Sequence, residues 1–135
     1  MRTAILLLLF TLTGIGVRAQ KEISFFEGTW DEALAESKET GKPIFMDCYT
    51  VWCGPCKLMD RNTFKDKAVA EFFNENFICV KMDMEKGEGL DLSREYRITA
   101  YPTLLILDSD GGVKSRILGY QPPEKFLEFG KTATE

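Results

Sequence analysis

The feature that most constrains the fold of this chain is residues 52–57, Trp-Cys-Gly-Pro-Cys-Lys, where two cysteines lie three positions apart. An almost entirely apolar run, residues 44–51, precedes the pair and predicts a central strand that is covered on both faces. A segment with helical character follows. A C-x-x-C pair placed where a strand leads into a helix is typical of a redox-active dithiol.

The start of a helix suits the chemistry of both thiols. Cys53 would face unpaired backbone N–H groups and the positive end of the helix dipole, which stabilise a thiolate. The thiolate is the nucleophile in disulfide exchange. Cys56 lies one turn later, close enough to attack the mixed disulfide that Cys53 forms. Gly54 and Pro55 complete the motif, and Pro55 fits a first helical turn, where its missing N–H is tolerated.

Half of a zinc site is the alternative interpretation of this pair. Structural zinc needs four nitrogen or sulfur ligands, commonly from two C-x-x-C pairs. The chain has no histidine, and its other two cysteines, Cys48 and Cys79, do not form a second pair of this spacing. We therefore predict a redox dithiol, with no metal and no other cofactor.

Residues 1–19 have the pattern of a secretory signal peptide. A basic start is followed by an apolar run at residues 4–12, and the small residue Ala19 offers a cleavage site. An uncleaved membrane anchor is the alternative, although the apolar stretch is shorter than the roughly 20 residues that span a bilayer. We expect cleavage after Ala19 and one domain at residues 20–135.

The chain is acidic, with a formal net charge of −4, and removing residues 1–19 takes away two arginines and no acidic residue. Scattered charges of this sign give no reason to expect nucleic-acid binding. Four cysteines are too few for a disulfide-stapled scaffold. We expect a monomer that buries a small core of its own.

Apolar periodicity and helix-capping residues predict alternating strands and helices. Expected strands are residues 21–27, 44–51, 77–82, 103–107 and 113–118. The first helix is expected to begin after Thr29, which forms a capping box with Glu32, and to end at Gly41. Further helices are expected over residues 57–60, after Asp66, and over residues 90–96 and 122–131. Residues 62–66 interrupt the second helical stretch, and residues 110–112 form a hairpin turn. This order predicts a mixed sheet with helices on both faces.

The motif W-C-G-P-C-K resembles the active site of the thioredoxin family, and the tripeptide at residues 101–103 and the hairpin at residues 110–111 extend the resemblance over roughly residues 30–129. It implies the thioredoxin fold, an α/β architecture with a central mixed sheet flanked by helices on both faces. The broken helix after the dithiol and the predicted signal peptide are more similar to exported thioredoxin-like proteins. This group includes the C-terminal domain of the membrane reductant transporter of the bacterial periplasm. We therefore expect a periplasmic protein.

Asp47 is a lone carboxylate within the apolar strand. Burial disfavours the charged form and raises the pKa of a carboxyl group, which suits proton transfer near neutral pH. The resemblance implies that Asp47 deprotonates Cys56 through a water and that Lys81 is the lysine paired with Asp47. A solvated strand end is the alternative for both residues. Lys57 either adds positive potential near the dithiol or belongs to the helix surface.

Three further residues are expected to bind substrate. An X-Pro bond in a folded protein is cis in only about 5% of cases, but the resemblance implies a cis bond before Pro102, beside the dithiol. Tyr101 would then offer its backbone to an extended substrate segment, as in strand addition. Its side chain is bulkier than the small aliphatic residue that is usual at this place. Trp52 is expected in an exposed apolar rim for docking proteins, with core filling as the alternative.

Strand alternation places the other two cysteines. If Asp47 and Lys81 face each other on neighbouring strands, Cys79 shares the face of Lys81 and Cys48 lies on the face opposite Asp47. We interpret both as buried apolar side chains that do not form a disulfide with each other.

The leading hypothesis is a thiol-disulfide oxidoreductase that reduces disulfides in other proteins. Cys53 would attack the substrate disulfide, and Cys56 would resolve the mixed disulfide. An exported reductase has no cytosolic reductant at hand, so a membrane thiol-reductant transporter is the implied electron donor. An oxidase or isomerase is the alternative enzyme, and a non-catalytic binding module is the alternative from another class.

Overall fold

The computed structural model describes residues 21–135. The predicted signal peptide at residues 1–19 and its cleavage after Ala19 lie outside the described residues. Among the helices of residues 21–135, none combines the length and apolar character that a membrane span requires. In chain order the elements are α1 (Trp30–Thr40), β1 (Ile44–Tyr49), α2 (Gly54–Arg61), the 3-10 turn η1 (Thr63–Lys65), α3 (Lys67–Asn76), β2 (Ile78–Asp83), α4 (Glu88–Glu95), β3 (Thr103–Leu107), β4 (Val113–Leu118) and α5 (Pro123–Thr134).

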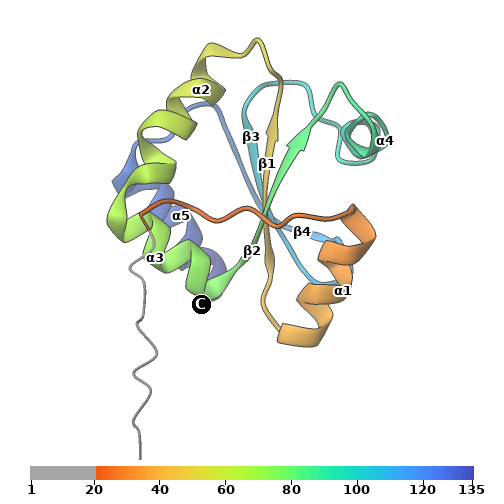
Figure 1. Ribbon diagram of the computed structural model, residues 1–135, viewed down its shortest axis with the longest axis horizontal. Helices are drawn as coiled ribbons and strands as arrows, with labels where there is room; N and C mark the ends of the chain where they lie inside the picture. Colours follow the sequence, from red (N-terminus) through yellow and green to blue (C-terminus); the bar gives the residue numbers. More distant parts are fainter. Residues whose placement is uncertain (1–20) are drawn as a thin grey trace, which may run out of the picture.

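The strands of this part of the chain form one four-stranded mixed sheet in the order β2-β1-β3-β4. β2 runs parallel to β1, whereas β3 is antiparallel to both of its neighbours, β1 and β4. In Figure 1, α2, α3 and α5 lie on one side of the sheet, and α1 and α4 lie on the other. The predicted fold class, a central mixed sheet flanked by helices on both faces, is therefore confirmed.

The predicted first strand at residues 21–27 is wrong. The segment makes isolated backbone hydrogen bonds, from Ile23 N to Phe64 O (2.8 Å) and from Phe26 N to Cys79 O (2.7 Å). Figure 1 shows it running across the sheet rather than along β2. Because strand pairing needs a series of bonds to one neighbour, the segment covers the core without joining the sheet.

Local sequence signals set the helix ends that frame the site. At α1, Glu32 N donates to Thr29 Oγ1 (3.2 Å) and Thr29 N donates to Glu32 Oε2 (2.7 Å), which completes the predicted capping box. Gly41 ends this helix in the left-handed conformation, with φ of 73°. The predicted break after α2 is confirmed, because η1 separates α2 from α3. Asp66 then caps α3 by accepting a hydrogen bond from Val69 N at 3.0 Å.

β1 is shorter than predicted, because it ends at Tyr49 instead of continuing to residue 51. Residues 51 and 52 form a turn, and the side chains of Val51 and Trp52 are exposed. The chain leaves the sheet at the C-terminal end of β1 and enters α2 directly. This connection places the C-x-x-C pair just beyond the C-terminal end of β1, an inner strand of the sheet.

Buried apolar side chains pack against β1 on both faces of the sheet. Phe45 lies on the face covered by α3 and α5, where the rings of Phe73 and Phe126 stack with their centroids 4.2 Å apart. Burying one such ring contributes roughly 2 kcal/mol. Asp47 lies two residues after Phe45 and faces the same side of the sheet. The aromatic cluster therefore anchors the strand that carries the carboxylate.

Candidate redox-active site

Cys53 and Cys56 form a disulfide at the first turn of α2. Cys53 is the N-cap residue, and its Sγ accepts a hydrogen bond from Cys56 N at 3.2 Å. Cys53 is 3% exposed and Cys56 is 2% exposed, whereas Gly54 and Pro55 between them are exposed. The sulfur of Cys53 therefore faces the backbone N–H groups and the positive dipole end of α2. Both would stabilise a thiolate once the disulfide is reduced.

Asp47 is completely buried, so the alternative of a solvated strand end does not describe it. Its partner on β2 is Lys81, whose Nζ donates to Asp47 Oδ2 at 2.9 Å. Within the described residues, Asp47 Oδ1 makes no hydrogen bond. Burial raises the pKa of Asp47 to about 6, although the charge of Lys81 opposes this rise. A carboxyl group with such a pKa can exchange protons near neutral pH.

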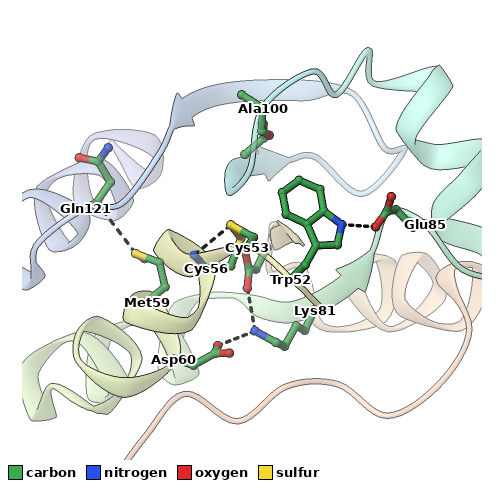
Figure 2. The surroundings of a disulfide bond; sticks show 11 residues. Trp52, Cys53, Cys56, Met59, Asp60, Lys81, Glu85, Ala100 and Gln121 are labelled. Atoms are coloured by element: carbon green, nitrogen blue, oxygen red, sulfur yellow. Dashed lines mark hydrogen bonds and ion pairs between the residues drawn. A yellow bond between two sulfur atoms is a disulfide. The ribbon is translucent and has the colours of Figure 1, made fainter. Parts of the chain in front are cut away.

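Sequence reasoning missed a third charged residue of this cluster, Asp60 on α2. Lys81 Nζ also donates to Asp60 Oδ1 at 2.5 Å, so one ammonium group bridges two carboxylates (Figure 2). Burial lowers the pKa of Lys81, but the neighbouring carboxylates outweigh burial and the net direction is upward. Asp60 lies 21 residues from Lys81, in a helix whose sequence offers no sign that this side chain has a partner.

The bond between Tyr101 and Pro102 is cis, and Pro102 is buried. Figure 2 shows Ala100, the residue before Tyr101, in the loop that lies opposite Cys53 and Trp52. Trp52 is 63% exposed, so it does not fill the core, and its ring meets that of Tyr101 edge-on at a centroid distance of 5.8 Å. We call Trp52 and Tyr101 the aromatic rim. Trp52 Nε1 donates to Glu85 Oε1 at 2.6 Å, a contact that sequence reasoning missed (Figure 2).

The remaining residues singled out from the sequence stand apart from this cluster. Lys57 is exposed, and within residues 21–135 its side chain makes no hydrogen bond or ion pair. Cys48 and Cys79 are free, buried and packed on opposite faces of the sheet, as predicted. Burial raises the pKa of Cys79 to about 12 and also raises that of Cys48, so both remain protonated thiols. The part of the chain that the structure describes holds no group of three or more potential metal ligands.

Residues 30–134 match the family described as the thioredoxin-like domain, and the chain therefore belongs to this family. The thioredoxin of Mycoplasma genitalium is 32% identical over 95 residues, which are 70% of this chain and 86% of that protein. Thioredoxin Y2, chloroplastic, of Arabidopsis thaliana is 36% identical over 112 residues, and the match spans 83% of this chain but 60% of that protein. The thiol:disulfide interchange protein DsbD of Actinobacillus pleuropneumoniae is 29% identical over 106 residues, 73% of this chain but 18% of DsbD.

Solved structures agree with this assignment. A solution structure of a candidate disulphide-isomerase from Bacteroides thetaiotaomicron superposes with a TM-score of 0.75 at 44% identity, covering 87% of this chain and 98% of that one. The oxidised DsbD C-terminal domain of Neisseria meningitidis has a TM-score of 0.67 at 26% identity, covering 82% of this chain and 99% of that one. The resemblance stated from the motif is thus confirmed, and the chain is a thioredoxin-like disulfide oxidoreductase with a C-x-x-C pair.

Proposed function

We propose that this protein is an exported thiol-disulfide oxidoreductase that reduces disulfides in other proteins. The observation that carries the proposal is the Cys53–Cys56 disulfide at the N-terminus of α2, together with the buried Asp47 on the strand that precedes it. The helix terminus stabilises an attacking thiolate, and the carboxylate supplies a proton acceptor.

The proposed reaction has two exchange steps. In the first, the thiolate of reduced Cys53 attacks one sulfur of the substrate disulfide, so that a mixed disulfide forms and the other substrate sulfur leaves and takes up a proton. In the second, Cys56 passes its proton through a water to Asp47, and the resulting thiolate attacks Cys53 Sγ. The remaining substrate sulfur leaves as a thiolate and is protonated. The substrate gains two electrons, and the Cys53–Cys56 disulfide is formed again.

Asp47 is suited to the proton transfer in the second step. Its Oδ2 is bonded to Lys81, but its Oδ1 has no hydrogen-bond partner within residues 21–135 and is the oxygen that can take up a proton. Because its pKa is raised to about 6 by burial, Asp47 is mostly ionised at neutral pH and is a stronger base than an ordinary carboxylate.

The aromatic rim and the loop before β3 are proposed to hold the substrate. Exposed Trp52 offers apolar surface, and Tyr101 packs against its ring. The backbone of Tyr101, next to buried Pro102, would pair with an extended segment of the substrate in the manner of an added strand. The disulfide of that segment would then lie over Cys53.

A membrane thiol-reductant transporter is the proposed electron donor, and the periplasm is the proposed compartment. The pattern of residues 1–19 supports export. Similarity to the DsbD C-terminal domain supports a donor of this kind. An exported reductase needs such a supply, because compartments outside the cytosol favour disulfides.

A disulfide isomerase is the second candidate, because the Bacteroides thetaiotaomicron protein described as a candidate disulphide-isomerase is 44% identical. The two functions differ in reduction potential, which is about −270 mV for thioredoxin and about −180 mV for protein disulfide isomerase. The chain has no histidine to stabilise the Cys53 thiolate further, and the buried Asp47 carboxylate opposes that stabilisation. We therefore expect a potential nearer that of thioredoxin.

Equilibration of the purified protein with glutathione redox buffers tests this proposal. A potential below about −180 mV supports the reductase, and a value above it overturns the reductase in favour of the isomerase or oxidase. An insulin-reduction assay separates both enzymes from a binding module. Wild type is expected to turn over, whereas Cys53→Ser should not, because it lacks the attacking thiol. Absence of wild-type turnover would favour the binding module.

A further inference from the structure

The charge cluster near the dithiol contains one carboxylate more than a single lysine–aspartate pair. Lys81 Nζ lies 2.9 Å from Asp47 Oδ2 and 2.5 Å from Asp60 Oδ1 (Figure 2). The side chain of Asp47 is completely buried, whereas that of Asp60 is 44% exposed. One ammonium group is therefore shared between an inner carboxylate, which has no contact with solvent, and an outer carboxylate, which does.

Aromatic rings hold the ammonium group between these carboxylates. The centroids of Tyr49, Phe25 and Phe64 lie 4.5, 5.4 and 5.5 Å from Lys81 Nζ, at distances typical of cation–π contacts. Tyr49 belongs to β1, Phe25 to the segment that precedes α1, and Phe64 to η1. Rings from three separate segments therefore surround the ammonium group where it contacts both carboxylates.

We propose that Asp60 is a positioning residue for the dithiol chemistry: by sharing Lys81 with Asp47, it keeps Asp47 basic enough to accept the proton of Cys56. The inference rests on the proposed function, because it assigns a supporting charge of the same site.

Two electrostatic effects of Asp60 act on Asp47 in the same direction. The negative charge of Asp60 disfavours a second negative charge on Asp47, which lies within ~6 Å because both carboxylates contact one Nζ. The hydrogen bond to Asp60 also takes up part of the positive charge that Lys81 would otherwise direct at Asp47. Burial is the main cause of the raised pKa of Asp47, and the charge of Asp60 adds to it.

Apart from Lys81, no other group around Asp47 in the described residues acts on its charge as Asp60 does. Its partner on β3 is Leu104, which carries no charge, and its neighbour Tyr49 has a pKa raised by burial and stays neutral. A cavity of about 300 Å³ opens beside Lys81 and Asp60, and the other charged groups that line it are Glu22, Arg61 and Lys65. Within residues 21–135 none of these three forms an ion pair or hydrogen bond with Asp47. The cavity also gives water access to Asp60, so a neutral side chain there would stay solvated.

A carboxyl ¹³C NMR titration of the oxidised protein measures the effect directly. Asp60→Asn should lower the pKa of Asp47 by about one unit, the lower end of the effect of a neighbouring charge, because Asp60 is half exposed. Asp60→Glu should restore the wild-type value. Asp91→Asn is the matched control, because it also removes a carboxylate from an ion pair, here with Arg94 on α4, and should leave Asp47 unchanged. A pKa of Asp47 that is unchanged or raised in Asp60→Asn overturns the proposal.

The same variants should shift the kinetics of the second exchange step. The acid limb of the rate at which Cys56 resolves a mixed disulfide is expected to move to lower pH by about one unit in Asp60→Asn. A structural role of Asp60 would reduce stability without moving this limb, and that result would also overturn the proposal. If Asp60→Asn does not fold, Asp60→Ser is the second variant, and it must also lower the pKa of Asp47, because it removes the same negative charge. The NMR titration needs no turnover, so it tests Asp60 separately from the proposed reductase activity.

Discussion

Replacing Asp47 by asparagine should make the protein more stable at neutral pH. The side chain is completely buried, and burial raises the pKa of its carboxyl group from 3.8 to about 6. A raised pKa means that the folded protein binds a proton at Asp47 more tightly than the unfolded chain does. The stability that this proton contributes is fully present below pH 3.8 and is lost as the pH rises through about 6.

The magnitude follows from the difference between these two pKa values. A difference of about two units, at 1.36 kcal/mol for each, gives a loss of about 3 kcal/mol in wild type at neutral pH. Asparagine keeps the shape of the side chain and carries no charge at any pH. Lys81 keeps Asp60 as a partner in the variant. Asp47→Asn should therefore raise the free energy of unfolding by about 3 kcal/mol near pH 7 and change it little near pH 3.

Urea unfolding of the oxidised protein at a series of pH values between about 3 and 8 measures this difference. Asp91→Asn serves as the control, because the carboxylate that it removes is exposed and paired with Arg94 at the surface. The control should show no gain that grows with pH. An Asp47→Asn variant that is no more stable than wild type near pH 7, or whose gain is the same near pH 3, would show that the buried charge of Asp47 does not reduce stability.

Three further expectations follow from the site and the sequence. At neutral pH, Asp47→Asn should lengthen the lifetime of the mixed disulfide, measured by acid quenching and alkylation, and an unchanged lifetime would mean that Asp47 is not the proton acceptor. Peptide mapping under non-reducing conditions should find no peptide that joins Cys48 to Cys79, because the two thiols pack on opposite faces of the sheet, and such a peptide would contradict the register of β1 and β2. Intact-mass analysis of the exported protein should give a chain that begins at Gln20, whereas a mass that includes residues 1–19 would indicate an uncleaved anchor.

Local signals in the sequence determined the helix ends and the faces of β1. Thr29 and Asp66 cap their helices as predicted, because a capping hydrogen bond closes within three residues of the chain. The family resemblance predicted that Asp47 and Lys81 pair across β1 and β2, and the two-residue period of a strand then predicted that Cys48 and Cys79 lie on opposite faces of the sheet. The cis bond before Pro102 followed from the family resemblance and not from the local sequence, because most X-Pro bonds are trans.

Contacts between distant segments were decided only by the tertiary structure. Residues 21–27 have the composition of a strand, but pairing requires a sheet edge that runs alongside, and this segment crosses β2 with isolated bonds. Asp60 and Glu85 look like ordinary surface residues, and their partners Lys81 and Trp52 lie 21 and 33 residues away. A hydrogen bond is short and directional, so such a pair forms only when packing of the whole core brings the two side chains within about 3 Å.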